Sequence, residues 1–212
     1  EMFPLLIFIG IGALTDFGPL LENPKFVLLG AAGQFGIFLT LLLALMLGFT
    51  TNEAASIGII GAIDGPTSIY VSGILAPHML GPITVAAYSY MSLVPIIMPP
   101  VVYFLTTKEE RAIRMPYSSR KISRRTRIMF PIIVTALVGT LVPFATPLIG
   151  MLMLGNLMKE SGAVERLTKA SSNEIANAVT LFLGLAIGST MVGTDFLKPS
   201  TLFILILGLL AF

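Results

Sequence analysis

The sequence predicts an all-α, polytopic membrane protein, and three observations support this class. Hydrophobic residues make up 55% of the 212 residues and charged residues only 11%, against about 25% charged residues in an ordinary soluble domain. The mean hydropathy is +0.93, and long uncharged runs separate short charged stretches. Such a chain cannot cover its surface with polar groups, so we expect lipid to be its main solvent.

The residue types that are missing or rare exclude several kinds of chemistry. The chain has no Cys, no Trp and a single His. Disulfide frameworks, thiolate metal sites and cysteine nucleophiles are therefore excluded, and a multi-histidine zinc or haem site is not expected. A disordered chain is excluded too, because disordered chains are poor in hydrophobic residues.

Charged residues divide the chain into eight candidate spans: 2–14, 26–48, 53–76, 82–105, 128–145, 147–158, 173–193 and 199–212. The two at the ends of the chain, 2–14 and 199–212, are well short of the roughly 20 residues that a membrane helix needs, and short spans of this kind are expected to be half-helices or parts of longer spans. The chain opens at Glu1 and closes at Phe212, inside an apolar run. We therefore expect an internal piece of a longer polypeptide, without a signal peptide.

The basic residues predict how the spans are oriented. The loop 106–127 holds eight of the thirteen Lys and Arg residues: Lys108, Arg111, Arg114, Arg120, Lys121, Arg124, Arg125 and Arg127. This loop is expected to be cytoplasmic. If every span crosses once, the loop 159–172 is cytoplasmic too, and Lys25 and Lys198 lie outside. The loop lacks the interleaved aromatic residues of a nucleic-acid site, so no nucleic-acid partner is expected; docking of a cytoplasmic protein stays open.

A weak internal repeat has a spacing of 143 residues. Residues 4–12 resemble residues 147–155, and five predicted crossings separate the two copies. Because five is odd, the copies are expected to enter the membrane from opposite sides, as in the inverted repeats of secondary transporters. The predicted organisation is a first repeat at 1–105, the basic loop 106–127, and a linking span with the start of a second repeat at 128–212.

Asp64 is a carboxylate in the middle of the predicted span 53–76. At the centre of a membrane helix, an Asp costs about 2.5–3.5 kcal/mol, and such residues are normally functional. Gly65 and Pro66 follow it, and Pro66 leaves the carbonyl of Ala62 without its helical partner. We therefore expect a broken helix here, with Pro66 in the first turn of a second half-helix.

This break gathers oxygen atoms of several kinds. The carbonyl of Ala62, the carboxylate of Asp64 and the hydroxyl groups of Thr67 and Ser68 suit a small hard cation such as Na⁺, and broken helices in transporters supply the same combination. The carboxylate can alternatively hold a proton, and a group that binds either Na⁺ or H⁺ is the minimal element of an exchange cycle. The competing interpretation is a structural Asp that caps the second half-helix.

Other polar residues give weaker signals. Tyr88 and Tyr90 carry phenols that could relay a proton, although tyrosines are also common at membrane interfaces. His78 is expected in a solvated loop and Asp16 in a turn. Asn156 is expected to be an interhelical hydrogen-bond partner.

Short motifs cover nearly the whole chain: Gly10 to Leu20, Gly30 to Gly36, Glu53 to Gly61, Asp64 to Thr67 (Asp-Gly-Pro-Thr), Val85 to Met91 (with Tyr-Ser-Tyr) and Leu148 to Leu157. Together they resemble the β subunit of the biotin-dependent, sodium-pumping decarboxylases, a family that includes the oxaloacetate, methylmalonyl-CoA and glutaconyl-CoA decarboxylase pumps. The resemblance implies Asp64 as the chief ion-site residue and Tyr90 in proton handling. Two departures are Ile63, where a small residue is expected, and a second polar motif, which would lie beyond Phe212.

The resemblance also implies an activity and partners. A carboxyltransferase and biotin-carrier α subunit would load biotin, and the β subunit would decarboxylate carboxybiotin, consume a proton from outside and export Na⁺. A small single-span γ subunit, membrane lipid, an oligomeric complex and the inner (plasma) membrane belong to the same expectation. The alternatives are a secondary Na⁺-coupled carboxylate carrier or Na⁺/H⁺ exchanger without biotin chemistry, and a structural membrane anchor.

Overall fold

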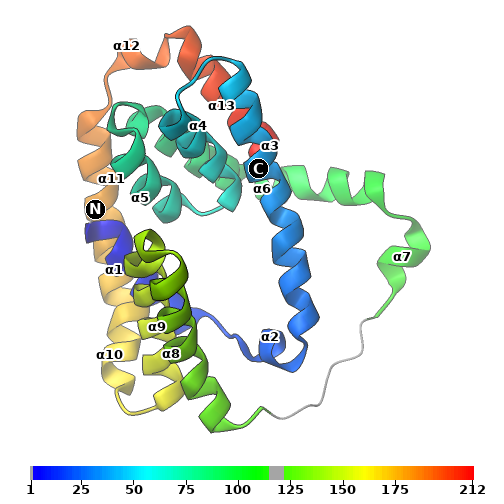
Figure 1. The fold of residues 1–212 in the computed structure, drawn as a ribbon, viewed down its shortest axis with the longest axis vertical. Coiled ribbons are helices and arrows are strands. Elements are labelled where there is room, and N and C mark those ends of the chain that lie inside the picture. Colours follow the sequence, from blue (N-terminus) through cyan, green and yellow to red (C-terminus); the bar gives the residue numbers. More distant parts are fainter. Residues whose placement is uncertain (1, 115–121) are drawn as a thin grey trace.

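The computed structural model describes residues 2–114 and 122–212, and every regular element in these ranges is helical (Figure 1). The α-helices are α1 (Met2–Leu14), α2 (Gly18–Glu22), α3 (Val27–Met46), α4 (Thr51–Gly58), α5 (Gly65–Leu75), α6 (Leu80–Leu105), α7 (Lys108–Ala112), α8 (Arg124–Leu141), α9 (Thr146–Ser161), α10 (Glu165–Ala170), α11 (Ala176–Thr190), α12 (Gly193–Phe196) and α13 (Pro199–Ala211). Short 3-10 segments are η1 (Pro24–Phe26), η2 (Ile59–Ala62), η3 (Pro77–Met79) and η4 (Pro143–Ala145), and η5 (Ser171–Ile175) is a π-helical turn. The all-α prediction is confirmed for these ranges; Arg120 and Lys121 of the basic loop lie outside them.

Two helical stretches of the described chain are long and apolar enough to cross a membrane. Pro24–Met46 has 23 residues and a mean hydropathy of 2.1, and Pro77–Leu105 has 29 residues and a mean hydropathy of 1.6. They coincide with the predicted spans 26–48 and 82–105. Large apolar side chains of α3, such as Phe35 and Phe38, are more than 60% exposed, as expected of a surface that faces lipid.

The buried side chains form three clusters, and α5 contributes to two of them. One cluster joins α3, α4, η2, α6 and α13. A second joins α1, α5 and α11, and a third joins α1, α5 and α9. Since α5 also packs along α4 and α6, the half-helix that follows Asp64 lies between the two groups of helices (Figure 1).

The two similar segments of the predicted repeat, α1 and α9, pack directly against each other. Glycines allow this close approach, since a Cβ on Gly12 would collide with the carbonyl oxygen of Leu152 and one on Gly155 with that of Ile9. The buried Asn156 amide donates to the Gly12 and Thr15 carbonyls at 3.5 and 3.1 Å. Its predicted role as an interhelical hydrogen-bond partner is confirmed.

The predicted span 53–76 is not a single crossing, which corrects the topology predicted from the sequence. It consists of α4, η2 and α5, and its two outer ends meet, because His78 Nε2 lies 2.9 Å from Glu53 Oε1. The chain therefore enters along α4, turns near Asp64 and returns along α5. The span is a helical hairpin whose arms begin and end on the same side.

This hairpin reverses the direction of the preceding helices relative to those that follow. Four crossings, not five, now precede α9, so α1 and α9 run in the same direction: Leu148 clusters with Phe8, while Lys159 Nζ donates to the Thr15 carbonyl at 2.9 Å. The two segments are therefore not an inverted pair. The helix α2 also lies at the end of the molecule that carries α10 and the start of α8 (Figure 1). Lys25, three residues after α2, therefore belongs to that end and not to the opposite one.

The α1–α9 contact makes a prediction about stability. We expect Gly155→Ala to lower the free energy of unfolding by about 1–3 kcal/mol, because the new methyl group overpacks a backbone contact. Gly30→Ala in α3 is the matched control: nothing lies within 4 Å of its added Cβ, so the change is expected to be neutral or to stabilise by up to about 1 kcal/mol. Thermal unfolding of the full-length protein in detergent, followed by circular dichroism, measures both; equal midpoints would contradict the close contact.

Candidate functional site

The break in the hairpin is made by one residue with a left-handed backbone. Ile63 has φ 57° and ψ 34°, the only positive φ at a non-glycine residue in the described chain. A β-branched residue is a true outlier in this region, and such strain costs on the order of 1–3 kcal/mol and gathers at functional sites. Ile63 ends η2, and Asp64 then returns to an extended conformation before α5 begins.

Asp64 caps the second half-helix. Its Oδ2 accepts a hydrogen bond from the Thr67 backbone N–H at 3.2 Å and a short one from the Thr67 hydroxyl. A carboxylate at this position satisfies N–H groups that a helix start leaves without partners. The cap interpretation and the ion-site interpretation are compatible, because both of these hydrogen bonds end on the same carboxylate oxygen, Oδ2. The Asp64 side chain as a whole is half-buried.

Ser68 joins the two sides of the break. Its hydroxyl donates to the Asp64 carbonyl at 3.0 Å and lies 3.4 Å from the Ile59 carbonyl, and its side chain is fully buried. The hydroxyl therefore connects η2 with α5, which is a role that sequence reasoning did not assign to it. Ala62 is the last residue of η2, and none of the hydrogen bonds between described elements ends on its carbonyl.

These contacts show which predicted ligands come together. Thr67 touches Asp64 directly, and Ser68 is joined to it through the backbone carbonyl. Ala62 stands two residues before Asp64, on the other side of the turn. The Asp64 carboxylate, the Thr67 hydroxyl and the Ser68 hydroxyl on the Asp64 carbonyl thus gather at the tip of the hairpin, in the kind of setting that suits a hard cation. Among the described residues, no contact joins the Ala62 carbonyl to them.

The two tyrosines of α6 face different parts of the molecule. A Cβ on Gly65 would lie 2.9 Å from Tyr88 Cε1, so the Tyr88 ring covers the first turn of α5. Tyr90 is buried; its hydroxyl donates to the Leu205 carbonyl of α13, and its ring lies 5.9 Å from that of Phe212. Residues two apart on a helix do not share a face, so Tyr88 and not Tyr90 touches the segment that Asp64 caps.

The last turn of α13 completes the surroundings of the break, and sequence reasoning missed it. A Cβ on Gly61 or Gly36 would collide with the Ala211 carbonyl oxygen, and Gly208 fits between Ile60 and Tyr90. The glycines were the available signal, because small residues allow membrane helices to approach closely. Gly36 has this role, while nothing lies within 4 Å of a Cβ built at Gly30 or Gly33.

Comparison with known proteins decides the family. The model of the family described as Na⁺-transporting oxaloacetate decarboxylase beta subunit matches residues 1–212. The chain belongs to this family. It is 57% identical to the methylmalonyl-CoA decarboxylase subunit beta of Propionigenium modestum over 212 residues, which are 100% of this chain and 53% of that protein. It is also 57% identical to the oxaloacetate decarboxylase beta chain of Klebsiella pneumoniae over 215 residues, 99% of this chain and 49% of that protein.

A relative from Veillonella parvula, named methylmalonyl-CoA decarboxylase subunit beta, is 56% identical over 212 residues, 100% of this chain and 57% of that protein. The chain thus spans about half the length of the curated relatives that it matches. The resemblance inferred from the motifs is confirmed at the level of the family.

The role of Ser68 in joining the break can be tested separately from function. We expect Ser68→Ala to lower the free energy of unfolding by about 1 kcal/mol, because the buried hydroxyl is lost together with its hydrogen bonds to the Asp64 and Ile59 carbonyls. Ser92→Ala is the matched control, since the Ser92 hydroxyl bonds the Tyr88 carbonyl of its own helix on an exposed face. Thermal unfolding midpoints compare the two; a larger loss for Ser92→Ala would contradict the proposed link.

Proposed function

We propose that this chain forms part of the membrane β subunit of a sodium-pumping decarboxylase. In this proposal the subunit decarboxylates carboxybiotin, takes up a proton and moves Na⁺ across the inner (plasma) membrane. The observation that carries the proposal is the broken helix in a chain of this family: a half-buried carboxylate at the tip of a hairpin, surrounded by hydroxyl and carbonyl oxygens. An apolar environment that keeps one carboxylate among oxygen ligands suits a site that alternates between Na⁺ and H⁺.

The proposed sodium site uses Asp64, Thr67, Ser68 and the Ala62 carbonyl. Asp64 supplies the negative charge, and the Ser68 hydroxyl holds the two half-helices at a fixed separation. Na⁺ is the transported substrate here and not a resident cofactor. Na⁺ arriving from the cytoplasm displaces the proton of Asp64 towards the biotin ring nitrogen, and a proton entering from outside later takes its place on Asp64 and expels Na⁺.

The chemistry of carboxybiotin agrees with a proton-delivering site. An N-carboxylated biotin loses CO₂ once its ring nitrogen is protonated, so delivery of a proton to a secluded pocket is the catalytic act. Tyr90 is the proposed proton-handling residue. Its buried hydroxyl donates to the Leu205 carbonyl of α13. A movement of α13 relative to α6 would break this hydrogen bond and free the hydroxyl to handle a proton, which supports the proposed role.

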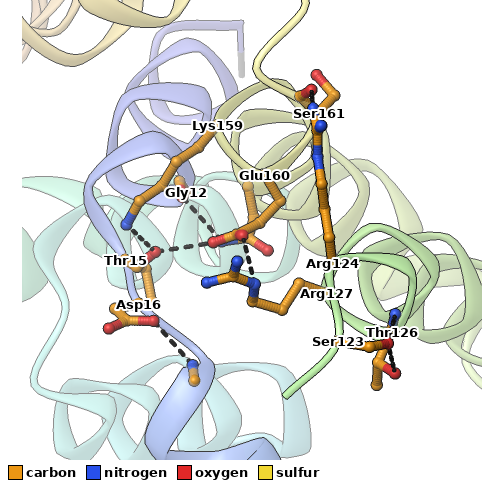
Figure 2. Close-up of polar contacts among 12 residues, drawn as sticks. Gly12, Thr15, Asp16, Ser123, Arg124, Thr126, Arg127, Lys159, Glu160 and Ser161 are labelled. Carbon is orange, nitrogen blue, oxygen red and sulfur yellow. Dashed lines mark hydrogen bonds and ion pairs between the residues drawn. The ribbon is translucent and has the colours of Figure 1, made fainter. Parts of the chain in front are cut away.

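The partners are part of the same proposal. Biotin would be carried by a carboxyltransferase and biotin-carrier α subunit, and a small single-span γ subunit would complete an oligomeric complex. The loop 106–127 is proposed to be cytoplasmic. Lys159 and Arg124 lie at the end of α9 (Figure 2), and this excess of positive charge supports the orientation.

Substitution of Asp64 tests the function. We expect Asp64→Asn to reduce both ²²Na⁺ uptake and CO₂ release by about a hundredfold or more, because the neutral amide can neither balance Na⁺ nor carry the proton. Asn caps helices about as well as Asp, so folding is expected to survive. The assay uses inside-out proteoliposomes of the full-length complex during substrate decarboxylation, and Asp16→Asn, an exposed turn carboxylate bonded to the Gly18 N–H, is the control.

Each other outcome contradicts a specific part of this proposal. Continued decarboxylation without uptake would leave Asp64 as an ion ligand and place the chemistry elsewhere. Na⁺ uptake that needs neither substrate nor biotin would indicate a secondary carrier. Unchanged uptake in Asp64→Asn would reduce the carboxylate to a helix cap.

A further inference from the structure

A groove runs between α8 and α9, away from the broken helix. It has a volume of about 370 Å³ and is lined by four residues of α8 between Pro131 and Ala136 and four residues of α9 between Gly150 and Leu157. Thr135 is the one polar side chain among them, and its hydroxyl donates to the Pro131 carbonyl at 2.8 Å. The wall that the groove presents to an occupant is therefore apolar.

One end of this groove is strongly basic. Arg124 and Arg125 stand seven residues before Pro131 and Ile132, and because seven residues are close to two helical turns, they lie on the same face of α8. Arg124 donates to the carbonyl of Ser161, and Arg127 Nε lies 3.3 Å from Glu160 Oε2 (Figure 2). These two contacts tie α8 to the end of α9, one turn beyond the apolar lining.

The charges at this end do not cancel. Of Arg124, Arg125 and Arg127, only Arg127 forms an ion pair within the described part of the chain, with Glu160, so two positive charges remain in excess. Arg124 donates to a neutral carbonyl and keeps its full charge. A guanidinium has five N–H donors, and since all three arginines are exposed, donors remain for an anion. Lys159 of α9 is directed elsewhere, onto the Leu14 and Thr15 carbonyls of α1.

We propose that this groove binds an anionic diacyl phospholipid, with one acyl chain between α8 and α9 and the phosphate at Arg124 and Arg125. An apolar groove alone would suit any lipid, and exposed arginines alone would suit any anion. The combination, at the end of the protein that carries the basic residues, matches basic pockets between membrane helices that hold acidic headgroups. The proposal rests on the membrane location in the proposed function and not on the chemistry of Asp64.

Lipid binding to the full-length complex tests the proposal. The probes are phosphatidylglycerol and phosphatidylcholine in detergent, with bound lipid counted by native mass spectrometry across a concentration series. We expect phosphatidylglycerol to bind at least about fivefold more tightly than phosphatidylcholine. We expect Arg125→Gln to weaken the binding of phosphatidylglycerol by about fivefold. Arg114→Gln removes the same charge from an exposed position outside the groove and is expected to bind like the unaltered protein.

A second variant tests the apolar part of the site. Gly150→Leu fills the groove, where the nearest atom to an added Cβ is Thr135 Cγ2 at 3.8 Å, so the substitution is expected to fold and to displace the acyl chain. We expect it to weaken binding of both lipids by about tenfold while all charges stay in place. Unchanged binding in Gly150→Leu would overturn the groove as the site, and equal affinity of the unaltered protein for the two lipids would overturn its selectivity.

Two further arms distinguish the lipid site from a simple phosphate site and from the pump. Competition by millimolar inorganic phosphate that removes phosphatidylglycerol completely would show a phosphate site and overturn the lipid assignment. The Asp64→Asn complex is expected to bind both lipids like the unaltered protein. Since no turnover is measured, this result keeps a failure of the lipid site distinct from a failure of the proposed pump.

Discussion

A helix that ends inside a membrane exposes backbone N–H and C=O groups that lipid cannot hydrogen-bond, and the chain meets this constraint at residues 59–68 with its own side chains. Asp64 accepts a hydrogen bond from the Thr67 N–H. The Ser68 hydroxyl donates to the Asp64 carbonyl and lies close to the Ile59 carbonyl on the other side of the break. These bonds let the helix stop, turn through the left-handed Ile63 and return. Because the span returns, α1 and α3 have the opposite direction, relative to the later helices, from the one that a simple crossing would give.

Close packing then places the tip of this hairpin among other helices. The half-helix α5 lies between the two helix groups, with Tyr88 of α6 against its first turn and the end of α13 against η2. Glycines at the crowded points, Gly61 beside α13 and Gly155 beside α1, allow backbone to touch backbone. In the proposed cycle, a change of ion at Asp64 acts at the start of α5, so α6 and α13 are the elements placed to respond.

Much of this arrangement could be predicted from local sequence. Hydropathy indicated the helices, and Gly65-Pro66 located the break. The expectation that residues 4–12 and 147–155 run in opposite directions was wrong, because it counted 53–76 as a crossing. The expected side of Lys25 depends on the same count. Hydropathy cannot distinguish a hairpin from a crossing span, since both are apolar and of equal length. The Glu53–His78 contact and the approach of α13 depend on residues far apart in sequence, which no local pattern connects.

The return of the hairpin is most directly tested by the sidedness of its two ends. The chain has no cysteine, so single-cysteine variants at Glu53, His78, Lys25 and Lys169 can be labelled with a membrane-impermeant maleimide in intact cells and in inside-out vesicles. We expect Glu53→Cys and His78→Cys to react from the same, outer side, and Lys25→Cys and Lys169→Cys from the cytoplasmic side. Labelling of positions 53 and 78 from opposite sides would show a crossing span and contradict the hairpin.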